Sequence, residues 1–238
     1  MTTTTKNINK LLLLGFCEGA IPLITETANE MLNCNTFDIV KNIETKTPRH
    51  PWKIPGFTLT SHHAKEYDFG AFPHKAYFGV FNAHIKYILY HYFNKYHGID
   101  KSRYLSLVHP LACLSKHATC DPGLYAGQLS NVSPFAKTGF GVSILSSCSV
   151  GHHAELGDFV NISPGVNIPG NVTVGEATEI GVGAVVLNNI HIGNHCLVGA
   201  GSVVTANLPD GVVAYGNPCK IIRENERWRK AADIVASF

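Results

Sequence analysis

The sequence predicts a small α/β domain with a parallel sheet over residues 8–107, a parallel β-helix over residues 108–222, and a short C-terminal helix over residues 223–238. Two observations carry this prediction. A six-residue repeat of apolar positions runs without interruption from 108 to 209, and strand-like and helix-like segments alternate in the hundred residues before it. Apolar residues make up 45% of the 238 positions, which is enough to fill a core in both parts.

The N-terminal part is expected to alternate strands with helices. Strands are predicted at Lys10–Leu14, Phe37–Val40 and Ala76–Phe81, and helices at Ala20–Leu32 and Ala83–Tyr96. Gly98 is expected to end the second helix. The stretch Thr45–Tyr67 contains three prolines and is predicted to be mostly loop, and the polar segment Met1–Asn7 is expected to fray.

The six-residue repeat determines the fold of the second part. Counted in sixes from Val108, the first residue of every hexad is aliphatic from Ile144 onward, and the fifth is small or of moderate size. A period of six fits neither an α-helix, with 3.6 residues per turn, nor a flat strand, with period two. It fits a coil with three flat faces, in which residues eighteen apart stack about 4.8 Å from each other. Seventeen hexads then give nearly six coils.

Glycine is common at the second position of the hexads, where we interpret it as serving bends that strain other residues. These glycines are Gly151, Gly157, Gly175, Gly181, Gly193 and Gly199. After the β-helix, Val212–Ile222 is predicted to be a short extended tail, and Glu224–Val235 a surface helix.

Charge and cysteine usage exclude several classes of protein. The formal net charge is only +2, so no nucleic-acid partner is expected. The longest apolar run near the start, Leu11–Leu14, is too short to span a membrane or to serve as a signal segment. Seven cysteines form no C-x-x-C pair, and Cys120, Cys148 and Cys196 occupy core positions of the repeat. This pattern indicates reduced thiols and a cytoplasmic protein.

Three segments carry a resemblance to a known family: Val150–Gly165, Ile168–Gly175 and Val213–Lys220. They resemble the sugar N- and O-acetyltransferases of the bacillosamine N-acetyltransferase and sialic acid O-acetyltransferase group. The resemblance implies a left-handed β-helix of hexapeptide repeats, a Rossmann-like N-terminal domain that binds a nucleotide sugar, and acetyl-CoA as acyl donor without a metal. It also implies a homotrimer with active sites between subunits. The likeness is specific in the β-helix and weak in the first hundred residues.

The same resemblance places the catalytic base on His152 and the backbone N–H that holds the thioester oxygen on Gly170. The repeat supports this pairing independently, because residues eighteen apart stack on adjacent coils. Without the motif, His152 would be read as a solvated side chain. The family has an acid directly after the catalytic histidine, where this chain has His153, and Glu155 or Asp158 are alternatives for that acid. A second family histidine corresponds to Asn161, an expected contact to the acetyl group or CoA.

The remaining candidate contacts are also implied by the resemblance. The segments 181–183 and 199–201 stack as a strip of small residues along which the pantetheine arm would run, although the repeat alone also explains glycine there. The strip contributes Gly181, Val182, Gly199 and Ala200, and Lys220 is a candidate phosphate contact. For the nucleotide, the candidates are Gly15, Phe16, Asn82 and Lys86. The family's glycine-rich first turn is replaced by the segment 15–20, which keeps only its first glycine.

The sequence thus favours an acetyl-CoA-dependent N-acetyltransferase that acts on the amino group of a nucleotide-linked amino sugar in bacterial-type glycan or lipopolysaccharide synthesis. One alternative is O-acetylation of a sugar hydroxyl, such as that of sialic acid. Another is a non-catalytic trimeric binding module that has kept the β-helix. Zinc chemistry like that of the γ-type carbonic anhydrases is not favoured, because neither His191 nor His195 has a histidine one coil away.

Overall fold

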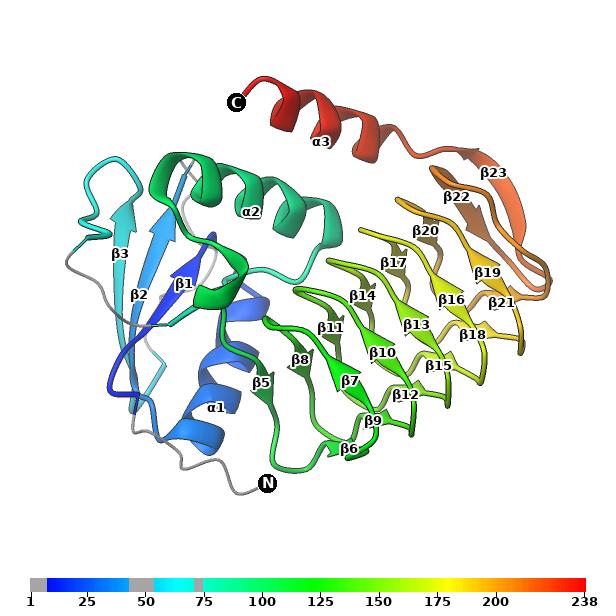
Figure 1. Cartoon of the computed structure of the whole chain (residues 1–238), viewed down its shortest axis with the longest axis horizontal. Helices are drawn as coiled ribbons and strands as arrows, with labels where there is room; N and C mark the ends of the chain where they lie inside the picture. Colours follow the sequence, from blue (N-terminus) through cyan, green and yellow to red (C-terminus); the bar gives the residue numbers. More distant parts are fainter. Residues whose placement is uncertain (1–7, 43–53, 71–74) are drawn as a thin grey trace.

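The computed structural model describes residues 8–42, 54–70 and 75–238. The predicted fraying segment 1–7 and part of the predicted loop, residues 45–53, lie outside this description. Within it, a four-stranded sheet flanked by helices stands at the N-terminal end of a long β-helix (Figure 1).

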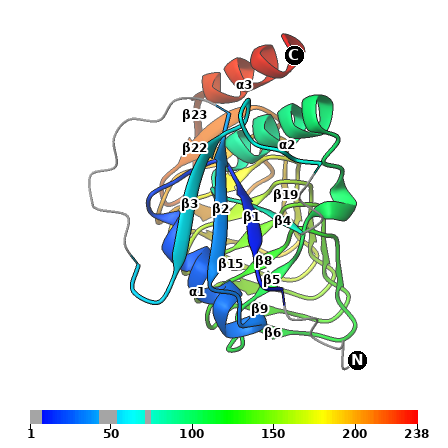
Figure 2. The ribbon, with the colours of Figure 1, turned by 90° about the vertical axis from the view of Figure 1, so that its left-hand side faces the viewer.

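The N-terminal sheet is parallel, in the order β3-β2-β1-β4. Its strands are β1 (Leu11–Leu14), β2 (Thr36–Lys41), β3 (Thr58–His63) and β4 (Ala76–Phe78), and its helices are α1 (Ala20–Leu32) and α2 (Ala83–His97). The four leucines of β1 are fully buried, and β1 lies between β2 and β4 (Figure 2). The α2 helix ends at Gly98 with a left-handed φ of 65°, as predicted. This order is that of the first four strands of a Rossmann fold.

The predicted loop over Thr45–Tyr67 is wrong from Thr58 to His63, where the chain forms β3. Among the described residues this strand pairs with β2 alone, and it is largely exposed. Its residues are mostly polar, so they lack the alternation of apolar and polar positions that marks a half-buried strand. Pairing with a partner that is distant in sequence creates the strand, and a local pattern does not reveal such pairing.

The β-helix has one two-residue strand per hexad, and these strands pair in parallel in three sheets. Two of the sheets have six and five strands, and the third has six β-helix strands and becomes eight-stranded through β22 and β23 after the repeat. The pairing joins residues eighteen apart, such as Val150 with Ile168, and the first positions from Ile144 to Val204 are buried. The predicted register is therefore confirmed. After η1 (Lys101–Arg103), the strands are β5 (Leu107–Val108), β6 (Cys113–Leu114), β7 (Thr119–Cys120), β8 (Tyr125–Ala126), β9 (Asn131–Val132), β10 (Lys137–Thr138), β11 (Ser143–Ile144), β12 (Ser149–Val150), β13 (Glu155–Leu156), β14 (Asn161–Ile162), β15 (Asn167–Ile168), β16 (Thr173–Val174), β17 (Glu179–Ile180), β18 (Val185–Val186), β19 (His191–Ile192), β20 (Leu197–Val198) and β21 (Val203–Val204).

The sequence predicted that the second-position glycines form the strained bends between these strands, but the strained backbone lies at another hexad position. The left-handed backbone falls on the fourth hexad position, where every residue from Gly123 to Gly201 has a positive φ, including His153 at 57°. The second-position glycines serve a different purpose, because a Cβ on Gly151 would lie 2.5 Å from the backbone nitrogen of Gly170. They let one coil approach the next closely, so the expectation that they form the strained bends is wrong.

The three edges of the prism differ in what covers them. The covered corner, between the five- and eight-stranded sheets, comprises 139–142, 157–160, 175–178 and 193–196, and α2 and the C-terminal helix lie along it (Figure 1). The open corner, between the six- and five-stranded sheets, comprises 133–136, 151–154, 169–172 and 187–190. The third corner, between the eight- and six-stranded sheets, comprises 127–130, 145–148, 163–166, 181–184 and 199–202.

The predicted extended tail after the β-helix is an antiparallel hairpin of β22 (Val212–Tyr215) and β23 (Lys220–Glu224), which extends the eight-stranded sheet. Helix α3 (Glu226–Ala236) follows and returns over the covered corner. Its Trp228 stacks on His195, with ring centroids 3.1 Å apart and planes 3° from parallel. The C-terminal helix is thereby attached to the β-helix.

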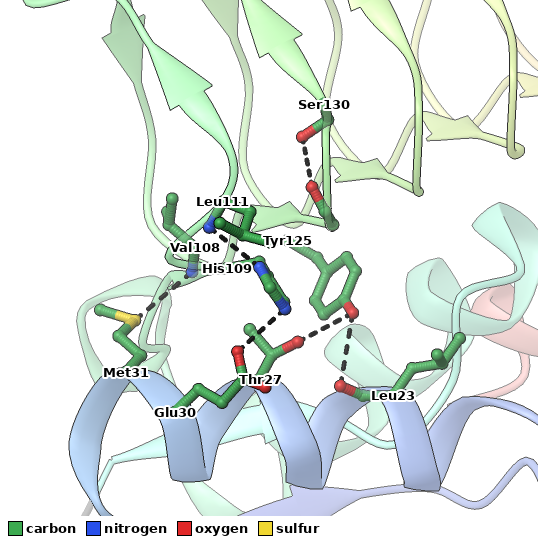
Figure 3. Close-up of polar contacts among 10 residues, drawn as sticks. Leu23, Thr27, Glu30, Met31, Val108, His109, Leu111, Tyr125 and Ser130 are labelled. Carbon is green, nitrogen blue, oxygen red and sulfur yellow. Dashed lines mark hydrogen bonds and ion pairs between the residues drawn. The ribbon is translucent and has the colours of Figure 1, made fainter.

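The N-terminal domain docks through α1 and α2. On α1, the hydroxyls of Thr27 and Tyr125 lie 3.1 Å apart, and Glu30 forms an ion pair with His109 at 2.9 Å (Figure 3). The apolar core of the N-terminal domain also includes side chains of the β-helix, among them Phe140 and Phe159. These contacts fix the domain on the eight-stranded sheet and the two corners beside it.

Candidate active site

His152 lies on the open corner with its imidazole directly over the backbone of Gly170. A Cβ added to Gly170 would meet Cε1 and Nε2 of the His152 ring at 2.5 and 2.6 Å, so only glycine leaves room for the ring in this position. His152 is exposed, whereas Gly170 is buried. The structure therefore brings together the two residues that the repeat spacing predicted to stack.

His153 is the hydrogen-bond partner of His152. The Nδ1 atoms of the two rings lie 3.1 Å apart, which leaves Nε2 of His152 over Gly170. The ring of His153 stacks on Phe135, one coil below, with centroids 5.0 Å apart. The motif gave no signal for Phe135, but the eighteen-residue spacing that pairs His152 with Gly170 also pairs Phe135 with His153.

The alternative acids are both occupied elsewhere. Glu155 forms an ion pair with Lys137 at 2.7 Å. Asp158 binds Lys101 at 2.7 Å and accepts a hydrogen bond from the backbone N–H of Phe140 on the covered corner. Among the described residues neither carboxylate is bonded to His152, and His153 occupies the place that the resemblance assigns to an acid.

The N–H of Gly170 bonds to no other residue in the described part of the chain. Amides at the same hexad position of the covered corner are capped by side chains one coil later. The N–H of Phe140 is bound by Asp158, and that of Glu176 by Asn194, each at 2.8 Å. The open corner thus presents a backbone donor beside a histidine nitrogen, which is the pairing that an acyl transfer requires.

The predicted strip of small residues lies on the third corner, on the other side of the six-stranded sheet from His152. Gly181 is required by packing, because its Cβ would lie 2.6 Å from the nitrogen of Ala200, and a Cβ on Gly199 would lie 2.6 Å from Tyr215. Val182 is 56% exposed, and Ala200 is exposed as well. Within one chain the structure does not bring this strip to the base.

Lys220 lies at the C-terminal end of that third corner. The turn before it binds β21, since Cys219 donates to the carbonyl of Val203 and Val203 donates to that of Gly216. Its side chain is exposed, so it remains available to an anion at the end of the strip.

Asn161 does not lie with His152. It is on β14 of the eight-stranded sheet, only 7% exposed, between Ser143 and Glu179 on the neighbouring strands. Within the described residues, its buried Oδ1 has no hydrogen-bond partner. The structure thus places this predicted cofactor contact under the N-terminal domain of its own chain, because the sixth hexad position here faces a packed surface.

Lys86 is fully buried between the two domains, which contradicts its predicted role as a nucleotide contact. Its ammonium group donates to the carbonyl of Gly141 and, at 2.8 Å, to the hydroxyl of Ser143. Burial lowers its pKa from 10.5 to about 7, against the attraction of Glu179. The helical spacing placed Lys86 on the first turn of α2 but could not show that this turn faces the β-helix.

The N-terminus of α2 is occupied by a carboxylate of the protein. The N–H of Ala83 donates to Oε1 of Glu179 at 2.8 Å, and Nδ1 of His84 lies 3.4 Å from the same atom. Burial raises the pKa of Glu179, but the bonds from His84 and Ala83 outweigh it, so the pKa lies below its usual value. A phosphate at this helix start would have to displace Glu179, which also argues against the predicted contact through the exposed Asn82.

Gly15 and Phe16 do lie where a nucleotide could bind, at the carboxyl end of β1. Gly15 has a left-handed φ of 83°, and its Cβ would meet Leu89 at 2.4 Å, so this turn requires glycine. Phe16 is half-buried, and Lys41 at the end of β2 lies over its ring, 5.5 Å from the centroid. Lys41 was missed by the sequence analysis, although its place at the end of a predicted strand of a parallel sheet could have indicated it.

Three solved structures with the same architecture cover nine tenths of this chain. The acetyltransferase domain of PglB from Neisseria gonorrhoeae FA1090, in complex with acetyl coenzyme A, is 24% identical, with a TM-score of 0.74 over 90% of this chain and 99% of that one. PerB from Caulobacter crescentus, in complex with CoA and GDP-perosamine, is 23% identical, with a TM-score of 0.75 over 90% and 98%. WeeI from Acinetobacter baumannii AYE is 22% identical, with a TM-score of 0.70 over 90% and 98%.

The chain has the fold of these three solved structures. Residues 171–206 also match the family described as bacterial transferase hexapeptide (six repeats), which confirms the predicted repeat class over that segment. No curated protein sequence matches the chain significantly. The resemblance proposed from the sequence is thus borne out in the repeat and in the architecture of both parts.

The helices and side chains of residues 8–42, 54–70 and 75–238 bear on membrane spans and metal ligands. No helix among them is long and apolar enough to cross a membrane. In the same residues, no group of three or more His, Cys, Asp or Glu side chains is arranged to hold a metal ion.

Proposed function

We propose that the chain is an acetyl-CoA-dependent N-acetyltransferase that acts on the amino group of a nucleotide-linked amino sugar in glycan or lipopolysaccharide synthesis. The observation that carries this proposal is the open corner, where Nε2 of His152 lies over Gly170 and the Gly170 N–H is unpaired among the described residues. Shared fold adds support, because PglB and PerB were solved with acetyl-CoA, or with CoA and GDP-perosamine.

In this mechanism His152 acts as the general base. The sugar amine attacks the thioester carbon while Nε2 of His152 takes its proton, and the N–H of Gly170 donates to the oxyanion of the tetrahedral intermediate. Collapse of the intermediate breaks the C–S bond and releases the CoA thiolate, which takes the proton from Nε2 of the His152 imidazolium and restores the free base. A positioned base contributes roughly 10²–10⁴-fold to the rate, and one oxyanion donor about 10²–10³-fold.

The acceptor and donor sites belong to different subunits in this proposal. The N-terminal domain packs on the eight-stranded sheet through Tyr125, Ser143 and Glu179, whereas His152 lies on the opposite corner of the prism. The small-residue strip is also remote from His152 within one chain. A homotrimer that sets the third corner of one subunit against the open corner of the next would unite the base, the strip and Lys220.

The nucleotide is proposed to bind at the carboxyl end of the N-terminal sheet. Gly15 and Phe16 form the turn after β1, and Lys41 adds a positive charge beside it. We place the enzyme in the cytoplasm, and its seven free cysteines support a reducing compartment.

The decisive experiment replaces His152 by Asn and follows release of free CoA thiol with UDP- and GDP-linked amino sugars. We expect kcat to fall about 10²-fold or more while calorimetry shows unchanged CoA affinity, because a base acts mainly in the transition state. His191→Asn, another exposed histidine of the β-helix, is the matched control and should keep full activity. If the wild-type trimer binds CoA but acetylates no amino sugar, the proposal fails. A product acetylated on oxygen would establish the alternative O-acetyltransferase.

The nucleotide site is tested separately by calorimetry with UDP, GDP and their sugars. Lys41→Gln should weaken binding about tenfold, since it removes one charge beside the diphosphate, whereas the exposed Lys65→Gln should not change it. Equal affinities for the wild type and the Lys41 variant would show that this edge of the sheet does not hold the nucleotide.

A further inference from the structure

We propose that His153 is the positioning residue of the catalytic base, and that a neutral imidazole here does the orienting work for which a carboxylate would be the usual partner. This inference rests on the proposed function and deepens it. It starts from the contact between the two Nδ1 atoms at 3.1 Å, which is hydrogen-bond distance.

A single proton can lie between two Nδ1 atoms, so one ring must donate and the other accept. If Nδ1 of His152 carries the proton and His153 accepts it, Nε2 of His152 keeps its lone pair over Gly170. The reverse arrangement would put the proton of His152 on Nε2 and block the base. When Nε2 takes the proton of the amine, His152 becomes an imidazolium and its Nδ1–H still donates to His153. Only the first arrangement therefore serves the reaction from start to finish.

The position of His153 is fixed by two features of the repeat. Its backbone is left-handed, at φ 57°, as at the fourth position of each neighbouring hexad. Its ring lies against Phe135 at 5.0 Å, and Phe135 lies against His117 at 5.8 Å on the coil below. This column of rings holds the imidazole of His153 from one side while its Nδ1 faces His152.

The charged groups around the pair leave this role to His153. The nearest acid along the chain, Glu155, is paired with Lys137, and Asp158 is paired with Lys101. On the next coil the facing residue at the fourth position is Asn171, whose amide donates to Asn189. His117 is separated from His153 by the ring of Phe135. A neutral acceptor orients the base but adds no negative charge, and protonation of His153 would remove the acceptor.

The test compares three replacements of His153 in the full-length protein. His153→Phe keeps an aromatic ring for the stack and removes the acceptor, and the repeat tolerates phenylalanine here, because Phe135 and Phe159 have φ of 65° and 61° at equivalent positions. We expect kcat to fall about 10–10²-fold, by analogy with lost orienting partners of metal-bound histidines, with KM for acetyl-CoA unchanged. His153→Asn, which accepts through its amide oxygen and suits a left-handed backbone, should keep most of the activity.

His153→Asp should keep or raise kcat and move the acid limb of the pH–rate profile to higher pH, since a carboxylate stabilises the protonated base. ¹⁵N NMR of the imidazoles gives a readout that does not need turnover. It should show the proton of His152 on Nδ1 in the wild type and a mixture of tautomers in His153→Phe. Full kcat in a folded His153→Phe variant, or an unchanged tautomer, would overturn the inference. Loss of activity in His152→Asn alongside full activity in His153→Phe would refute only the positioning role. Full activity in His152→Asn would refute the role of His152 as the base, and a wild type that acetylates no amino sugar would refute the proposed function itself.

Discussion

His153 and His195 occupy the same place in the repeat but have opposite surroundings. Both stand at the fourth hexad position with φ of 57°. His153 on the open corner is exposed and contacts His152. His195 on the covered corner is stacked on Trp228, and burial lowers its pKa to about 4. The repeat thus fixes the backbone of a position, and whatever covers the corner decides what its side chain can do.

The backbone amides show the same difference. On the covered corner, Asp158 and Asn194 cap the N–H groups of the preceding coil, so these amides are used within the fold. On the open corner the N–H of Gly170 has no such cap among the described residues. The amides of the covered corner thus contribute to the fold, whereas the open corner leaves a donor unpaired among the described residues.

Gly170→Ala tests the open corner and should have the largest effect. The new Cβ would displace the His152 ring, so we expect kcat to fall about 10²–10³-fold, the range for a lost base or oxyanion donor. The third hexad position otherwise carries side chains, such as that of Ala200, so the unfolding midpoint should change little. Asn188→Ala, at the same position one coil later, is the control for activity and unfolding. A large loss of stability in Gly170→Ala would show that the open corner also serves the fold.

Trp228→Ala tests the covered corner. Removal of the partly buried ring should lower the free energy of unfolding by about 1–3 kcal/mol at pH 7. In the wild type the folded pKa of His195 is about 4, whereas that of the unfolded chain is about 6.5. Between these values the unfolded chain binds a proton that the folded chain does not, so the free energy of unfolding should fall as pH drops from about 6.5 to about 4. The variant exposes His195 and loses this pH dependence. The difference in free energy of unfolding between wild type and variant should therefore become smaller as pH falls from about 6.5 to about 4. Urea unfolding between pH 4 and 7 measures it, with Ile234→Ala on the same helix as control; a constant gap would contradict the role of burial.

Lys86→Met tests the contact of α2 with the β-helix beside the covered corner. The folded pKa of Lys86 is about 7, below that of a lysine in the unfolded chain, so the unfolded state binds the extra proton between these values. Stability of the wild type relative to the variant should therefore rise with pH above about 7, by at most ~1.4 kcal/mol per unit. Below pH 7 the free energies of unfolding of wild type and variant should change with pH in parallel. Parallel curves up to pH 9.5 would show that Lys86 keeps its proton, and the exposed Lys116→Met is the control.

The β-helix could be predicted almost residue by residue, because its register is local and periodic. The stacking of Val150, Ile168 and Val186 follows from the spacing alone, and so does the pairing of His152 with Gly170. Apolar side chains are favoured inside the prism, and from Ile144 to Val204 the sequence places an aliphatic residue at the first position of every hexad. Such repetition determined the fold and half of the candidate site.

Contacts between parts that are distant in sequence were decided only by the tertiary structure. The edge strand β3 depends on pairing with β2, and the burial of Lys86 depends on docking of α2 against the carbonyl of Gly141. The tertiary structure also shows that Asp158 pairs with Lys101, whereas His153 is the partner of His152. These side chains have ordinary local patterns, and their roles follow from which corner of the prism the N-terminal domain and α3 happen to cover. A periodic sequence repeats the same backbone on all three corners, so only the packing of non-repeating segments makes one corner different from another.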